Sequence, residues 1–285
     1  MTTWNLSLFT ACAPWLPLSQ LAPHCVSAGL QGFDLAVKSH AFDTAQPFNF
    51  WNNNAAVLPS QDLAARAAEA SCILRQHGLK CRVLSSYIQP TELDEARRLA
   101  MAANSLQAPL VRIWSPRPEP GQARAQVAAA QAAWRELAAI ADAYGVRFVL
   151  ELHDHTITTG ASGALRLLDG LDPARVGVIL DIANAASEGN EPLALAVDLL
   201  GPYLAHVHVK DLAFRPGAAW NGLESGCVEL GQGTIRWPLC LRILREAGYN
   251  GWLAIENFTG MERGPERIVA DAAWLRATIE ESHRA

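Results

Sequence analysis

The chain has 285 residues, half of them hydrophobic, and a formal net charge of −5. This length and composition suit one large folded domain, and no apolar run reaches the roughly 18 residues that a membrane span needs. Only three lysines are present, Lys38, Lys80 and Lys210, and the arginines are scattered. The charge pattern therefore argues against a nucleic-acid-binding surface, and we expect neither a nucleic acid nor a membrane as partner.

The cysteines and the N-terminal segment indicate the compartment. None of the six cysteines forms a CxxC pair, which is typical of reduced and mostly buried thiols. The first residues include no basic segment, and Pro14 and Pro17 interrupt their apolar stretch, so a cleaved signal is not expected. We predict a cytoplasmic protein.

Strand-like and helix-like segments alternate along the chain. The strand candidates are continuous apolar runs, as in parallel strands that are covered on both faces. Apolar residues at a spacing of three to four predict helices between them, for example over 61–77, 124–144 and 237–247. Gly78, Gly145 and Gly248 fit C-terminal caps of these helices. The predicted strands cover residues 4–10, 32–37, 81–86, 109–114, 146–152, 176–182, 204–209 and 252–257.

Eight such units predict an α/β fold, a (β/α)8 TIM barrel that forms a single domain over residues 1–285. The alternative is an open doubly wound sheet, but no GxGxxG motif follows a strand to favour it. Residues 43–60 and 211–234 are expected to be long irregular loops over the C-terminal mouth, where this fold builds active sites. Within the second loop, Gly231-Gln-Gly233 is more typical of a tight turn than of an amide nest for an anion.

Four charged or imidazole side chains close four of the predicted strands in the second half of the chain. They are Glu151, Asp181, His208 and Glu256, at spacings of 30, 27 and 48 residues. Each alone could be an ordinary solvated or hydrogen-bonded group. Together, at the ends of successive strands of a barrel, they can converge on one point. Three carboxylates and one imidazole at that point predict a divalent-cation site.

Several short motifs in the same strands carry a family resemblance. The chain resembles the xylose isomerase-like superfamily of sugar isomerases and epimerases, which includes ketose 3-epimerases, hydroxypyruvate isomerase, inosose dehydratases and endonuclease IV. The resemblance covers nearly the whole chain and is specific for the superfamily, but it does not name a substrate. The motifs are Gly29-Leu-Gln-Gly32-Phe-Asp34, Leu150-Glu151-Leu-His153, Leu180-Asp181-Ile-Ala-Asn184, His206-Val-His208-Val-Lys210-Asp211, Gly231-Gln-Gly233 and Gly248-Tyr-Asn-Gly251-Trp-Leu-Ala-Ile-Glu256.

The resemblance implies that Glu151, Asp181, His208 and Glu256 hold one divalent metal ion. It also implies that Glu151 and Glu256 act as acid and base at the two faces of the substrate. A cation at the carbonyl oxygen stabilises the enediolate that forms when an α proton leaves. The oxygen-rich ligand set favours Mn²⁺ or Mg²⁺, and Co²⁺ or Zn²⁺ would also fit.

Five further residues are expected to contact the substrate. His153 and Lys210 continue the inward sides of their strands. The alternative for His153 is a structural hydrogen bond, and Lys210 could hold a hydroxyl or carboxylate group of the substrate. Asn184 stands where many epimerases of the family have histidine, which weakens a direct transfer of ketose 3-epimerase activity. A buried Arg112 needs an anion, either a ligand carboxylate or an acidic group of the substrate. Trp114 is either a sugar-stacking ring or a core anchor.

The leading functional prediction is a metal-dependent isomerase or epimerase of a sugar, keto-sugar or related polyol. A dehydratase on the same site, like the inosose dehydratases, is the close alternative. A DNA-repair endonuclease is disfavoured by Asn184 and by the acidic charge, and a non-catalytic sugar-binding subunit by the retention of all four ligand positions. Whether the substrate is phosphorylated stays open. Helix faces rich in alanine and leucine permit a homo-oligomer.

Overall fold

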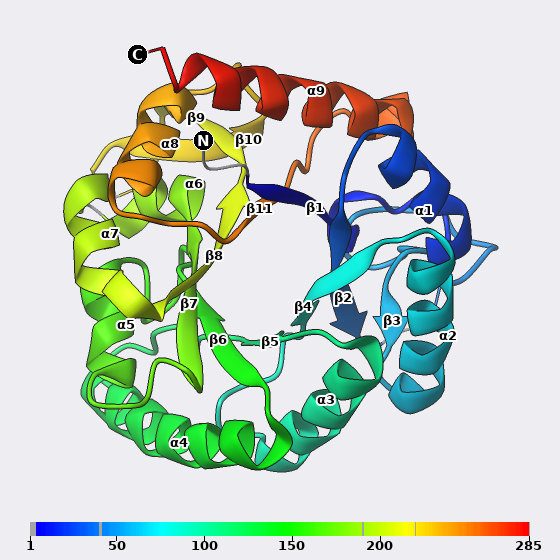
Figure 1. Ribbon diagram of the computed structural model, residues 1–285. Coiled ribbons are helices and arrows are strands. Elements are labelled where there is room, and N and C mark those ends of the chain that lie inside the picture. The colour runs from blue at the N-terminus through cyan, green and yellow to red at the C-terminus, as the bar shows by residue number, and fades with distance from the viewer. Residues whose placement is uncertain (1–3, 40–41, 190, 220, 285) are drawn as a thin grey trace.

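A closed barrel of parallel strands forms the centre of the computed structural model, which describes residues 4–39, 42–189, 191–219 and 221–284. Each strand pairs with its neighbours in parallel, and β1 pairs with both β2 and β11, which closes the ring (Figure 1). The strands of the barrel are β1 (Asn5–Phe9), β2 (Gly32–Lys38), β4 (Lys80–Ser85), β5 (Leu110–Ile113), β6 (Arg147–Glu151), β7 (Val176–Asp181), β8 (Leu204–Val209) and β11 (Trp252–Ile255).

Helices surround the barrel and cover the outer face of its strands (Figure 1). In the described part of the chain, no helix combines the length and the apolar character that a membrane span requires. The longer helices are α1 (Leu18–Ser27), α2 (Leu63–Gln76), α3 (Leu93–Leu106), α4 (Ala123–Tyr144), α5 (Ala161–Leu168), α7 (Leu193–Leu200), α8 (Trp237–Glu246) and α9 (Glu266–Glu281).

The closed ring confirms the predicted TIM barrel and excludes the open doubly wound sheet. Every predicted strand begins and ends within two residues of the observed one. The three predicted helices correspond to α2, α4 and α8. Gly145 ends α4 in the left-handed conformation with φ of 67°, as its place after the apolar periodicity predicted.

The interior of the barrel changes from apolar to charged along the strands. Side chains at alternate positions of a strand point to the same face, so every second residue faces the barrel axis. A layer of five buried apolar side chains lies at one level of the interior, from β4 to β8. The next inward positions toward the carboxyl ends of β5, β6 and β7 carry Arg112, Glu151 and Asp181. The apolar layer consists of Val83, Leu110, Val149, Ile179 and Ala205.

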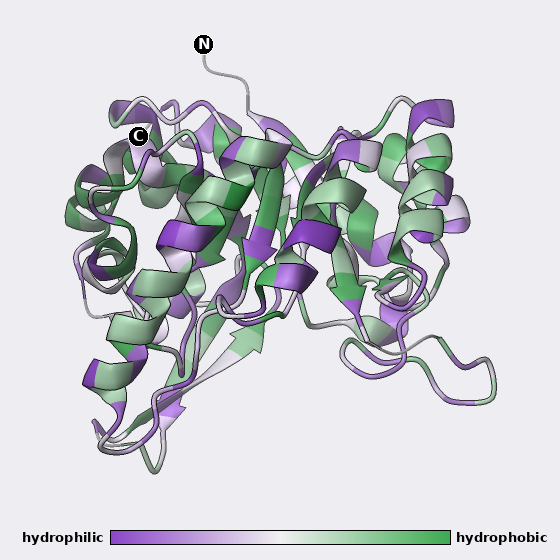
Figure 2. Cartoon of the chain, turned by 90° about the horizontal axis from the view of Figure 1, so that it is seen from below, coloured by the Kyte–Doolittle hydropathy of each residue, from purple (hydrophilic) through white to green (hydrophobic). Residues whose placement is uncertain are grey.

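The segment after β8 is not the irregular loop that was predicted. It folds into an antiparallel hairpin of β9 (Asp211–Pro216) and β10 (Leu223–Val228). Both strands are exposed over most of their length, and they lack the continuous apolar run by which barrel strands are recognised. The hairpin and the long loop after β2 project from the same side of the barrel (Figure 2).

Asp211 fixes the base of this hairpin. Its carboxylate accepts hydrogen bonds from the backbone amides of Leu212, Gly231, Gly233 and Ile235, at 2.9 to 3.3 Å. A Cβ atom added at Gly233 would collide with this carboxylate. The segment is a turn, as predicted, since the backbone amide of Gln232 donates to the backbone oxygen of Glu229 at 2.9 Å. Two of its amides also bind an anion, the internal carboxylate of Asp211.

Replacing Asp211 by alanine should lower the free energy of unfolding by at least about 2 kcal/mol, because several backbone amides would lose a charged acceptor. Urea denaturation followed by circular dichroism measures this change. Asp198→Ala, at an exposed position of α7, should change the stability by less than about 0.5 kcal/mol. Equal effects of the two substitutions would show that the Asp211 bonds do not stabilise the fold.

Candidate metal centre

The four side chains predicted to converge do meet at the mouth of the barrel. Glu151, Asp181, His208 and Glu256 lie at or just beyond the carboxyl ends of β6, β7, β8 and β11. Each can place one donor atom within 4.8 Å of the donors of the other three. Two donors on opposite sides of one cation, each about 2.1–2.4 Å from it, would be about 4.2–4.8 Å apart. The spacing therefore fits one bound ion.

The imidazole of His208 has two distinct sides. Its Nδ1 lies 3.3 Å from Oε1 of Glu151 and 3.6 Å from Oε2 of Glu256. Its Nε2 points away from these carboxylates toward Asp34. Nδ1 is thus the nitrogen placed to act as a ligand, and the ring stacks on Phe9 at a centroid distance of 5.8 Å.

Two cationic side chains compensate the glutamates. Arg112 Nη1 lies 2.5 Å from Oε2 of Glu151, and Lys210 Nζ lies 3.0 Å from Oε2 of Glu256. Burial alone would raise the pKa values of the two glutamates, but Arg112 and Lys210 respectively hold these pKa values below their usual range. Both glutamates are therefore ionised at neutral pH.

Asp181 shows that the carboxylates remain crowded. Burial and the charges of Glu256 and Glu151 raise the pKa of Asp181 to about 7, although Lys210 Nζ is 2.7 Å away. Its Oδ2 accepts no well-aligned hydrogen bond from the described residues. A divalent cation between the carboxylates would relieve this repulsion and could be coordinated by Oδ2 of Asp181. Three carboxylates and a ring nitrogen thus fit a metal of the Mg²⁺, Mn²⁺ or Zn²⁺ type.

Asp34 adds a supporting residue that was not predicted from the sequence. It is fully buried on β2, and its Oδ2 lies 2.7 Å from Nε2 of His206 and 3.5 Å from Nε2 of His208. Burial alone would raise the pKa of Asp34, but the two imidazoles lower it well below its usual range. A carboxylate on the far nitrogen of a ligand histidine fixes the ring and increases its basicity. Asp34 was visible in the sequence only within a family motif, and its partners lie across the barrel.

The other predicted residues surround the four ligands. Lys210 donates to Oδ1 of Asn184 at 2.9 Å, and the backbone amide of Asn184 donates to Oδ1 of Asp181 at 2.9 Å. His153 packs against Trp114 at a ring distance of 4.6 Å and is about a quarter exposed. The guanidinium carbon of Arg112 lies 5.2 Å from the centre of the Trp114 ring. All five predicted substrate contacts therefore lie beside the four candidate ligands, and their roles remain predictions.

Comparison with protein families gives one match over most of the chain. The family described as "Xylose isomerase-like TIM barrel" matches residues 25–278. Among curated proteins, the inosose dehydratase of Bacillus anthracis is 26% identical over 129 residues, which is 42% of this chain and 43% of that protein. The matched segments span about two fifths of the length of the curated relatives.

Solved structures agree in fold at low sequence identity. The 3-keto-D-glucoside 4-epimerase YcjR of E. coli superposes with a TM-score of 0.73 and 15% identity, over 96% of this chain and all of that one. The IOLI protein, whose crystal structure has a bound zinc atom, superposes with a TM-score of 0.76 and 16% identity, over 98% of this chain and 99% of that one. At these identities the likeness concerns the fold.

We expect one divalent ion per chain in protein that is purified or loaded with Mn²⁺, as counted by inductively coupled plasma mass spectrometry. At a free-ion concentration of a hundred times the Kd, binding should stabilise the fold by about 2.7 kcal/mol, and chelation should reverse this. His208→Gln should abolish binding, whereas His283→Gln, at an exposed position, should not. Absence of metal under every loading condition would contradict the assignment.

Asp34→Asn should weaken metal binding by about 10- to 100-fold, because the amide no longer offers a negative acceptor to the ligand imidazole. Competition with a fluorescent chelator measures the affinity. Asp142→Asn, which breaks the surface ion pair with Arg175, provides the matched control. Unchanged affinity in Asp34→Asn would mean that this carboxylate serves His206 alone.

Proposed function

The chain belongs to the xylose isomerase-like TIM barrel family, and from this membership we propose that it is a metal-dependent isomerase or epimerase of a keto-sugar or related polyol. The observation that supports the proposal is the buried group of Glu151, Asp181, His208 and Glu256 at the barrel mouth. Relatives with a similar fold or sequence act on sugar-like compounds by their names. The proposed reaction begins with removal of a proton next to a carbonyl group.

A divalent cation held by these four residues would supply electrophilic stabilisation of the negative charge that develops on the substrate oxygens. The protein residues would supply the proton transfers. Glu151 and Glu256 extend from β6 and β11, which β7 and β8 separate in the barrel. Since both are ionised, one can accept the α proton through a carboxylate oxygen. The other has to take up a proton before it can protonate the opposite face of the same carbon.

Arg112 and Lys210 would keep these two carboxylates in place. Each cation contacts one oxygen of its glutamate and leaves the rest of the carboxylate available. Lys210 also reaches Asn184 and Asp181, so it links three acceptors in the cavity. Fixed donors of this kind avoid reorganisation during the reaction. His153 and Trp114 would form one wall for the substrate.

A dehydratase is the second candidate, supported by the similarity to an inosose dehydratase over 129 residues. The same base could remove an α proton, and loss of a β-hydroxyl group as water would follow. The mass of the product distinguishes the two reactions, because an epimerase or isomerase conserves the mass of its substrate. The metal of the enzyme, with Mn²⁺ or Mg²⁺ favoured by the ligand set, belongs to the same proposal.

Glu151→Gln and Glu256→Gln should each reduce turnover by about 10²- to 10⁴-fold while sparing substrate binding, because the amide cannot accept the α proton. Uptake of deuterium from D₂O by a panel of ketoses and inosose-like polyols, followed by NMR, identifies the reacting carbon. Glu246→Gln, at an exposed position of α8, should leave the rate unchanged. Full activity in both active-site variants would refute the acid–base roles.

A further inference from the structure

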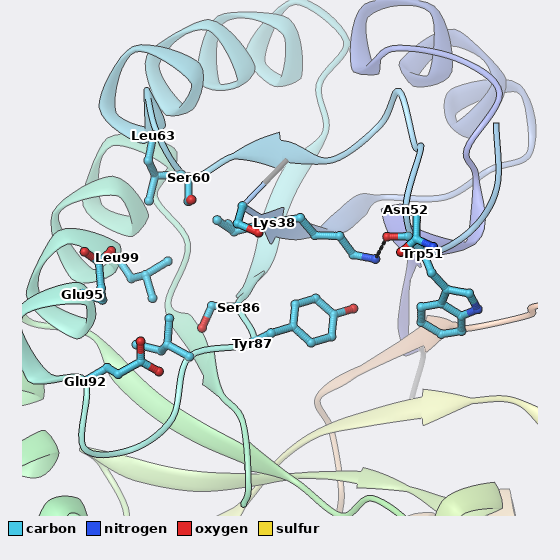
Figure 3. A pocket seen from close by; sticks show the side chains of 13 residues that line it. Lys38, Trp51, Asn52, Ser60, Leu63, Ser86, Tyr87, Glu92, Glu95 and Leu99 are labelled. Atoms are coloured by element: carbon cyan, nitrogen blue, oxygen red, sulfur yellow. Dashed lines mark hydrogen bonds between the residues drawn. The ribbon is translucent and has the colours of Figure 1, made fainter. Parts of the chain in front are cut away.

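A cavity of 610 Å³ lies at the carboxyl ends of β2 and β4, and two side chains link it to the metal centre. Its walls come from the end of β2, the loop that follows it, the end of β4 and helix α3 (Figure 3). Tyr87 connects the two regions, since the guanidinium of Arg112 lies 4.6 Å from the centre of its ring. Arg112 in turn contacts Glu151 of the metal centre.

Lys38 is the cation of this cavity. It ends β2 and shares the inward-facing alternation of Asp34 and Ala36, so its side chain points toward the barrel mouth. Its ammonium donates to the backbone oxygen of Trp51 at 2.6 Å. It also lies 5.2 Å from the ring of Trp51 and 5.3 Å from that of Tyr87. Figure 3 shows the amine directed toward Trp51 on the Tyr87 side of the cavity.

The ammonium of Lys38 donates to backbone oxygens, and no carboxylate of the described residues lies at ion-pair distance from it. Burial and the nearby positive charge of Arg112 lower the pKa of Lys38 to about 8. Lysine normally keeps its head group in water or pairs it with an acid. A half-buried ammonium beside a second cation is therefore a favourable place for an external anion.

The acidic residues of the cavity lie elsewhere and have their own donors. Glu92 and Glu95 line its opposite end, near α3 (Figure 3). Glu95 forms an ion pair with Arg98 at 2.7 Å, and the carboxylate of Glu92 accepts a hydrogen bond from the backbone amide of Gln89 at 2.5 Å. The cavity thus has an acidic outer end and a cationic inner end, and the cationic end is the one next to the metal centre.

We propose that Lys38 binds an anionic group of the substrate, a carboxylate or a phosphate, while the reacting carbon lies at the metal centre. The proposal rests on the proposed function, and it narrows the substrate class to acidic keto-sugars or polyols. Lys38 is then a specificity-determining residue. Tyr87 lines the same end of the cavity and offers a hydroxyl group beside it, whereas the Ser86 hydroxyl already donates to the backbone oxygen of Arg112 at 2.6 Å.

Arg112 links Lys38 to the metal centre. Lys38 and Arg112 approach the same Tyr87 ring, so their charged groups are within about 10 Å of each other. Arg112 in turn contacts Glu151 at 2.5 Å. A substrate whose acidic group lies several carbon atoms from its carbonyl group suits this arrangement.

Three ketoses that differ only at carbon 6 test this proposal: D-fructose, D-fructuronate and D-fructose 6-phosphate. Their affinities for the Mn²⁺-loaded full-length protein can be measured by isothermal titration calorimetry. We expect at least one acidic compound to bind about tenfold or more tightly than D-fructose, since it gains a charge-assisted contact. Lys38→Met should remove this preference without changing the affinity for D-fructose, and Lys38→Arg should retain it.

Lys80→Met serves as the control, because Lys80 is exposed at the opposite end of the barrel, where β4 begins. Tighter binding of D-fructuronate identifies a carboxylate, and tighter binding of the phosphate ester identifies a phosphate. Equal affinities of the three compounds would overturn the proposal, as would the absence of binding by all three. Equal losses of affinity for neutral and acidic compounds in Lys38→Met would also overturn it. Charge-dependent binding without deuterium exchange would instead refute the enediolate chemistry and leave the Lys38 assignment intact.

Discussion

The burial of three carboxylates in one small volume is the constraint on which the rest of the site depends. Charges removed from water destabilise a fold unless partners compensate them. Here Arg112 contacts Glu151, and Lys210 contacts Asp181 and Glu256. Burial and the charges of Glu256 and Glu151 nevertheless raise the pKa of Asp181 to about 7. The barrel thus contains a preformed group of crowded carboxylates whose spacing fits a divalent ion.

The barrel could be predicted from the sequence because its strands are continuous apolar runs that alternate with helical periodicity. The four ligand positions could be predicted because each closes such a run, and parallel strands bring their carboxyl ends to one edge. Both regularities are local along the chain, and the geometry of a closed barrel converts them into a shared site. The fold and the convergence of the four side chains could therefore be predicted from the sequence alone.

What could not be predicted depends on contacts across the barrel or between loops. Asp34 meets His206 and His208 from β2, a strand that does not pair with β8. Lys38 is set apart by its surroundings, because no carboxylate of the described residues lies at ion-pair distance from its ammonium. The β9–β10 hairpin is stabilised by pairing and by the bonds of Asp211, and neither leaves an apolar pattern in the sequence. The roles of Asp34, Lys38 and the β9–β10 hairpin depend on burial and on pairing partners, which the residue type does not reveal.

The attachment of the hairpin at Asp211 affects which substitutions and length changes the protein can tolerate. Lys210 lies between β8 and β9, and the residue that follows it fastens the chain to the turn at residues 231–235. The anchored base separates the ligands from the exposed strands beyond it. Substitutions or length changes in the outer hairpin can therefore accumulate at little cost to the metal centre. In engineering terms the outer hairpin is the part of the barrel mouth that can be redesigned while the barrel strands stay unchanged.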